Sequence, residues 1–127
     1  MEVNEMKICV DIDGVLASWD NGWRGVRFFG DVIDGAKYFL EELHKRDCEI
    51  IIYSCRGLEE LNAPYKAPML RNFIRDWLEA NDLPYDDIFV GQGKPIANYY
   101  VDDKGITCRP EDDPAAFNMA LEQMFKD

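Results

Sequence analysis

Residues 7–14 read KICVDIDG, a short apolar run that ends in two aspartates and a glycine. An apolar run without alternation is typical of a buried β-strand. A second run of this kind, EIIIYS, covers residues 49–54 and is rich in β-branched side chains. Between the two runs, apolar residues recur at helical spacing and predict a helix that begins after Asp34 as its N-cap and ends near Arg46.

The alternation of strands and helices continues toward the C-terminus. Residues 55–68 are expected to form a loop, and an amphipathic helix is predicted over residues 70–78. Short strand-like runs follow at residues 88–90 and 99–101, and a last helix is predicted after Asp113. This order predicts the α/β class with a mostly parallel sheet. Ligands of such sheets bind beyond the carboxyl ends of the strands.

Length and composition predict a single soluble domain over residues 1–127, since 47% of the residues are apolar and 31% are charged. The net charge of −11 argues against nonspecific binding to nucleic acid or to an anionic membrane. Neither a membrane span nor the apolar core of a signal peptide is recognisable. The four cysteines show no zinc-ligand spacing, so we expect reduced thiols in a cytoplasmic protein.

Polar side chains follow each predicted strand, where the topology would gather them in one cleft. They are Asp11 and Asp13 after the first strand, Ser54 and Arg56 after the second, Lys94 after the third, and Asp102 and Asp103 after the fourth. Carboxylates packed together repel one another, and a divalent cation such as Mg²⁺ relieves the repulsion. A carboxylate beside Mg²⁺ can attack phosphorus, and a second carboxylate can transfer the proton.

These residues also resemble a known family. VDIDG at residues 10–14, Ser54, Lys94-Pro95 and VDD at residues 101–103 are similar, in this order, to the four motifs of the haloacid-dehalogenase-like phosphohydrolases. The resemblance spans residues 7–103 and implies a three-layer, Rossmann-like core. Only about 20 residues separate the first strand from the first helix, too few for a cap domain, so a short flap is expected at residues 15–32.

The stretches IIYSCRGLEE (51–60) and GKPIANYYVDDKGI (93–106) are similar to a compact subgroup of that family. The subgroup includes small phosphatases of capsule-polysaccharide biosynthesis and uncharacterised bacterial and phage proteins. The family's roles transfer only to matching positions. Asp11 would be the nucleophile, Asp13 the general acid and base, Ser54 and Lys94 the phosphoryl-binding residues, and Asp11, Asp13 (through its main-chain carbonyl), Asp102 and Asp103 the Mg²⁺ ligands.

Three parts of the sequence have two interpretations each. Arg56 either contacts a substrate phosphate or carboxylate, or is a solvated loop residue. The aromatic residues of the flap, together with Arg24 and Arg27, either close over a substrate or pack on the domain or on another subunit. The loop at residues 57–68 either selects the leaving group or is an ordinary surface loop.

The function predicted is hydrolysis of a small phosphomonoester, a phosphosugar or a nucleotide, through an Asp11 phosphoenzyme with Mg²⁺ as cofactor. A response-regulator receiver domain is rejected because neither middle strand ends in Asp and Lys94-Pro95 precedes the strand that ends at Asp102. A catalytically silent phosphate-binding protein stays open, as does a nucleic-acid end phosphatase if a basic patch lies at the flap. An open site would also suit a homo-oligomer in which a neighbouring subunit supplies the lid.

Overall fold

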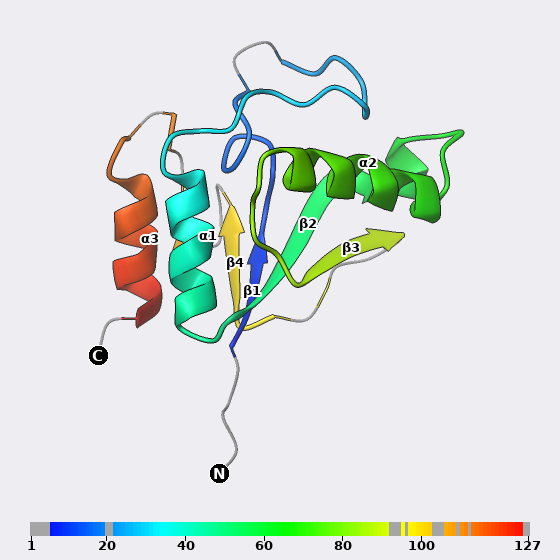
Figure 1. Ribbon diagram of the computed structural model, residues 1–127. Coiled ribbons are helices and arrows are strands. Elements are labelled where there is room, and N and C mark those ends of the chain that lie inside the picture. Colours follow the sequence, from blue (N-terminus) through cyan, green and yellow to red (C-terminus); the bar gives the residue numbers. More distant parts are fainter. Residues whose placement is uncertain are drawn as a thin grey trace.

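The computed structural model describes residues 6–19, 22–91, 95, 97–102, 106–108, 110–111 and 113–125 (Figure 1). The strands are β1 (Lys7–Val10), β2 (Glu49–Leu58), β3 (Asp87–Gly91), β4 (Tyr99–Asp102) and β5 (Ile106–Thr107). The helices are α1 (Ala36–Lys45), α2 (Ala67–Ala80) and α3 (Ala116–Phe125), with a 3₁₀ turn, η1, at Glu59–Leu61. No helix within these ranges is both long and apolar enough to cross a bilayer.

The strands form one sheet in the order β3-β2-β1-β4-β5, and every neighbouring pair is parallel. Strand β1 is central: Val10 pairs with Ile52 of β2 and with Val101 of β4. This register brings the carboxyl ends of β1 and β4 to the same edge of the sheet. The parallel sheet with flanking helices confirms the predicted α/β, Rossmann-like fold.

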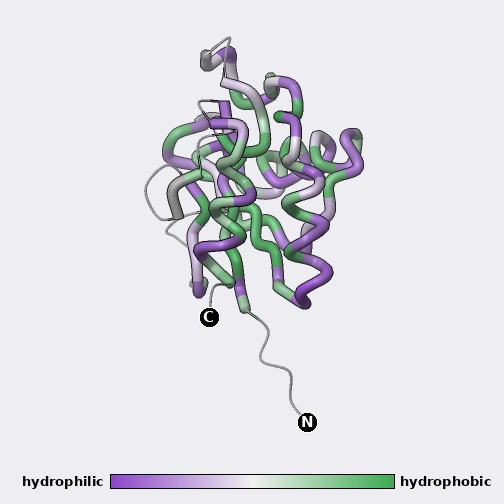
Figure 2. The backbone as a smooth tube through the Cα atoms, turned by 90° about the vertical axis from the view of Figure 1, so that its left-hand side faces the viewer, coloured by the Kyte–Doolittle hydropathy of each residue, from purple (hydrophilic) through white to green (hydrophobic). Residues whose placement is uncertain are grey.

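The hydrophobic core lies between the sheet and its helices. Strand residues that alternate along the chain, such as Ile8 and Val10 of β1 and Ile50 and Ile52 of β2, share one cluster with the apolar stripes of the helices. Helices α1 and α2 follow right-handed crossovers in the same direction across the sheet, which places both on this face. Helix α3 packs beside α1, and Figure 2 shows the hydrophobic segments concentrated in the interior.

Two local predictions were wrong. Helix α1 has Gly35 rather than Asp34 as its N-cap, because the cap has a φ of 95° and a Cβ there would lie 3.0 Å from the Phe117 ring. Strand β2 does not end at residue 54 but continues to Leu58, with a register shift against β3 between Tyr53 and Leu58. The loop that was predicted to begin at residue 55 therefore begins only after Leu58. The two-residue strand β5 was not predicted at all.

The segment predicted as a flap begins inside the core. Val15, Leu16 and Ala17 are buried, and Ala17 forms single bridges with Asp13 and with Val32. The outer part of the segment rises above the carboxyl end of the sheet as the blue and cyan excursion in Figure 1. Its base is closed by a hydrogen bond from the Ser18 amide to the Asp31 carbonyl at 2.7 Å. The flap is thus an extended loop with a packed base.

We expect Gly30→Ala to destabilise the flap and the domain. The two arms of the flap approach so closely that a Cβ on Gly30 would lie 2.0 Å from the Ser18 carbonyl oxygen. Overpacking of this kind costs about 1–3 kcal/mol in the free energy of unfolding, which urea denaturation measures. The control is Gly22→Asn in the same flap, where φ is +64° and nothing lies within 4 Å. Because Asn tolerates this conformation, equal losses in both variants would contradict the packed base.

Candidate active site

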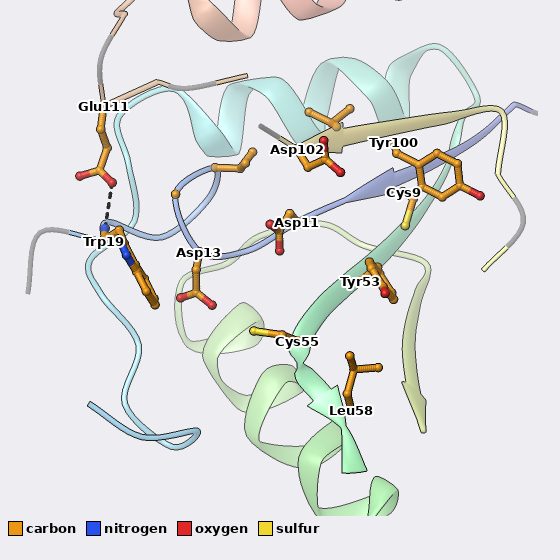
Figure 3. A pocket seen from close by; sticks show the side chains of 13 residues that line it. Cys9, Asp11, Asp13, Trp19, Tyr53, Cys55, Leu58, Tyr100, Asp102 and Glu111 are labelled. Carbon is orange, nitrogen blue, oxygen red and sulfur yellow. Dashed lines mark hydrogen bonds between the residues drawn. The ribbon is translucent and has the colours of Figure 1, made fainter. Parts of the chain in front are cut away.

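A pocket of about 600 Å³ opens at the carboxyl ends of β1, β2 and β4 (Figure 3). Of the residues predicted from the sequence, the pocket brings together Asp11, Asp13 and Asp102. Asp11 and Asp13 follow the end of β1, and both side chains line the pocket. Asp102 arrives from β4, whose Val101 carbonyl accepts the Asp11 amide hydrogen at 3.1 Å. Lys94 and Asp103 lie outside the described residues.

Ser54 is not at the pocket wall. Its hydroxyl is buried and accepts the Arg56 amide hydrogen at 3.1 Å. The neighbours Tyr53 and Cys55 line the pocket instead, because β2 continues past Ser54 and keeps the two-residue alternation of its side chains. The expectation that Ser54 reaches the cleft from a strand end is therefore wrong for this arrangement of the chain.

Arg56 is committed to contacts within the protein. Its side chain is 2% exposed, and it donates from Nε to Oδ2 of Asp13 at 2.8 Å and from Nη2 to Oδ1 at 2.9 Å. Its Nη1 donates to the carbonyls of Gly25 and Val26, both at 3.1 Å. These bonds use four of the five guanidinium N–H groups. The expected contact of Arg56 with a substrate phosphate is thus replaced by a bond to Asp13 and the flap.

Aromatic rings enclose the Arg56 guanidinium. The Phe29 ring centroid lies 4.1 Å from Cζ and the Trp23 centroid 4.7 Å. Phe29 also stacks on Trp77 of α2, with ring centroids 5.2 Å apart. Part of the flap therefore packs on the body of the domain, which favours that interpretation for Phe29 and Trp23. Trp19 differs, because it is 43% exposed and lines the pocket.

Glu111 is a pocket residue that the sequence did not indicate. Its Oε1 accepts the Trp19 amide hydrogen at 2.8 Å, and its Oε2 accepts the Ser18 hydroxyl hydrogen at 3.0 Å (Figure 3). Glu111 precedes α3 and is more than 90 residues from its partners, so no local pattern could reveal it. The flap is held at two places, by Glu111 near its base and by Arg56 farther along.

The arginines of the flap do not face the carboxylates. Arg24 and Arg27 line a separate hollow of about 480 Å³ between the flap and α2. Arg27 lies over the Phe73 ring, with Cζ 5.5 Å from the centroid. The positive charge of the flap is thus directed toward α2 and away from Asp11.

In the loop after β2, the Asn62 side chain binds back to the strand. Its side-chain amide donates to the carbonyls of Cys55 and Leu58 at 2.8 and 2.7 Å. Asn62 is buried, so these bonds stabilise the extended end of β2. A structural role is favoured for Asn62 over contact with a leaving group.

The pocket has a negative wall. Asp11, Asp13, Asp102 and Glu111 line it, and no Lys or Arg does among the residues that the structure describes. Partial desolvation of the thiol and the charges of Asp13 and Asp11 raise the pKa of Cys55 above its ordinary value. Desolvation likewise raises the pKa of Tyr53. An anionic ligand therefore needs a cation to enter.

The donors present fit Mg²⁺ better than a metal that needs many side chains. Among the described residues, no three His, Cys, Asp or Glu side chains lie close enough together to hold a metal ion. Both Asp13 oxygens accept hydrogen bonds from Arg56. The carboxylates of Asp11 and Asp102 come from the ends of adjacent strands. Mg²⁺ binds through one or two carboxylates and completes its shell with water and phosphate oxygens.

Two solved structures share the fold. A protein from Vibrio cholerae is 24% identical, with a TM-score of 0.54 over 93% of this chain and 98% of its own. A conserved protein from Bacteroides thetaiotaomicron is 20% identical, with a TM-score of 0.59 over 98% of this chain and 100% of its own. No family model and no curated protein matches the sequence. Similarity at this level of identity shows the fold alone.

Replacement of Arg56 by Met should destabilise the protein by about 3–5 kcal/mol, because the Asp13 carboxylate, whose side chain is only 12% exposed, loses its partner. Urea unfolding measures this loss. Arg75→Met is the matched control, since the Arg75–Asp76 pair is 44% and 70% exposed and should contribute less than about 1 kcal/mol. Adding Asp13→Asn to Arg56→Met should restore part of the stability. A double variant that is less stable than Arg56→Met would contradict the ion-pair explanation.

Alkylation of Cys55 by iodoacetamide should be slow at pH 8 and rise about tenfold per pH unit, because the raised pKa keeps the thiol protonated. Asp11→Asn should accelerate the reaction severalfold, since it removes a negative charge that opposes the thiolate. Mass spectrometry locates the label, and the other three cysteines are buried. Asp82→Asn, whose side chain is 91% exposed, is the control. Equal rates in wild type and Asp11→Asn would show that Asp11 does not influence this thiol.

Proposed function

We propose that this protein is a Mg²⁺-dependent phosphomonoester hydrolase that works through an aspartyl phosphate on Asp11. The observation that supports this most directly is the placement of Asp11 and Asp102 at adjacent strand ends in one pocket, which Asp13 also lines. The resemblance of VDIDG and VDD to motifs of the haloacid-dehalogenase-like phosphohydrolases points to the same chemistry. The shared fold alone would not, because one fold serves many functions.

In the first step an Asp11 carboxylate oxygen attacks phosphorus. The Asp11 O–P bond forms, the P–O bond to the leaving group breaks, and the leaving oxygen takes a proton from Asp13. In the second step water attacks the aspartyl phosphate and gives its proton to Asp13, which releases inorganic phosphate and restores Asp11. Asp11 is oriented by the Ile12 amide, which donates to its Oδ1 at 2.8 Å.

The bond between Asp13 and Arg56 sets a condition on proton transfer. Arg56 holds Asp13 as a paired carboxylate, so the proton must go to a lone pair that Arg56 does not use, and protonation weakens the two N–H···O bonds. The flap carbonyls that hold Arg56 would then control how easily Asp13 gains or loses a proton. Substrate binding and flap position are thereby linked.

Asp11 and Asp102 would hold Mg²⁺, with the Asp13 carbonyl and Asp103 as further proposed ligands. The ion would neutralise the phosphoryl oxygens, which the negative pocket otherwise repels. Lys94 stays proposed as a second cation for the same oxygens. No disulfide joins the four cysteines, all of which the structure describes, and this supports the proposed cytoplasmic location.

One observation favours the catalytically silent alternative. Both oxygens of the proposed general acid accept bonds from Arg56, and such a site could bind phosphate without turnover. A nucleic-acid end phosphatase is not favoured, since Arg24 and Arg27 line a hollow separate from the carboxylate pocket. Turnover therefore decides between the first two candidates.

Phosphate release should require both Mg²⁺ and Asp11. The substrates are p-nitrophenyl phosphate, phosphosugars and nucleoside monophosphates, each with Mg²⁺ and with chelator. We expect Asp11→Asn to lower kcat about 10³-fold or more, because it removes the nucleophile. Asp34→Asn, at an exposed position outside the pocket, is the control and should retain activity. Activity that survives Asp11→Asn would overturn the mechanism, and a folded wild type without any turnover would support the silent alternative.

A further inference from the structure

The pocket extends from the carboxylates over an apolar floor. Cys9 of β1 pairs with Tyr100 of β4, and its side chain lies between Tyr100 and Tyr53 of β2 in the pocket (Figure 3). Leu58, at the end of β2, adds an aliphatic wall. The part of the pocket beyond the reacting carboxylates is therefore lined by rings, thiols and aliphatic groups.

A second aromatic wall comes from the flap. Trp19 lies on the far side of Asp13 from Tyr53 and lines the same pocket (Figure 3). Its backbone is held by Glu111, so the indole is supported although it is 43% exposed. Aromatic side chains thus flank the carboxylates on both sides.

Three polar side chains that line this part of the pocket already have hydrogen-bond partners within the protein. The Tyr100 hydroxyl donates to the Pro95 carbonyl at 2.6 Å and accepts the Ala97 amide hydrogen at 3.2 Å. Glu111 accepts hydrogens from Ser18 and Trp19, and Asp13 accepts them from Arg56. A polyhydroxylated leaving group would share these acceptors with the protein's own donors, so it would gain less in this part of the pocket. A flat ring would instead find ring faces on which to pack.

The charge of the pocket restricts the ligand further. Asp11, Asp13, Asp102 and Glu111 are all acidic, and the described lining carries no basic side chain. One phosphate can be neutralised by a bound cation and would occupy that position. A second phosphate or another anionic group on the leaving side would face Glu111, and the described lining offers it no basic side chain.

We propose that the substrate is a monophosphate ester whose leaving group carries an uncharged aromatic ring, packed between Tyr53 and Trp19. This rests on the proposed function, because it places the phosphate at Asp11. The volume of about 600 Å³ accommodates one such ring system. A nucleoside monophosphate and an aryl phosphate share this chemistry, whereas a phosphosugar or a nucleoside triphosphate does not.

Binding of phosphonates, which cannot be hydrolysed, tests the proposal apart from turnover. In calorimetry with Mg²⁺ and the full-length wild type, phenylphosphonate should bind roughly tenfold more tightly than methylphosphonate. Trp19→Leu and Tyr53→Leu should each reduce this difference and leave methylphosphonate binding unchanged. Trp19 is exposed, so its replacement keeps the test valid if Tyr53→Leu fails to fold. Tyr38→Leu, an exposed tyrosine on α1, is the control.

The outcomes separate this proposal from the proposed function. Equal binding of both phosphonates would overturn the aromatic leaving group and leave the phosphate site standing. Binding of neither would overturn the phosphate site and this proposal with it. Faster release of phosphate from phosphosugars than from nucleoside monophosphates and phenyl phosphate would also overturn it. The rates of phosphate release from nucleoside monophosphates and from phenyl phosphate then show whether the leaving group is a nucleoside or a simple aryl group.

Discussion

The ion pair between Arg56 and Asp13 is the interaction on which the rest of the site depends. Removing both charges from water is costly, and the hydrogen bonds made by four of the five guanidinium N–H groups offset this cost. Asp13 provides two of the acceptors, and the carbonyls of Gly25 and Val26 provide the others. One side chain thereby joins β1, β2 and the flap. The position of the flap and the orientation of Asp13 are consequences of the same set of hydrogen bonds.

The flap is a supported loop because charged side chains bind it at two places. Glu111 binds the backbone near its base, and Arg56 binds it farther along between the rings of Trp23 and Phe29. Exposed loops are normally the least stable part of a domain. Here motion of the flap would also change the hydrogen bonds of Asp13. The chemistry we propose for Asp13 is therefore linked to the flap through direct contacts and needs no long-range pathway.

The second constraint on the site is its charge. Asp11, Asp13 and Asp102 converge in a protein whose net charge is −11, so a phosphate ester cannot approach without a cation. Two of these carboxylates are on adjacent strands, whereas the third is paired with Arg56. The three aspartates thus have different surroundings, and we expect them to have different roles although their side chains are chemically identical. The paired carboxylate is positioned for proton transfer, and the other two are the candidates for attack and for metal binding.

Local patterns in the sequence determined the α/β class, the helices and the parallel strands, because periodicity reports which side of an element is buried. They also predicted that Asp11, Asp13 and Asp102 would meet, since parallel strands end at one edge of the sheet. The orientation of Ser54 was missed because it depends on where β2 ends, and that end is set by pairing with β3 and by Asn62. Tertiary structure alone decided the partner of Arg56. The sequence around an arginine near a strand end is the same whether the guanidinium binds a substrate or a carboxylate 43 residues away in the chain. It therefore cannot predict which partner the arginine has.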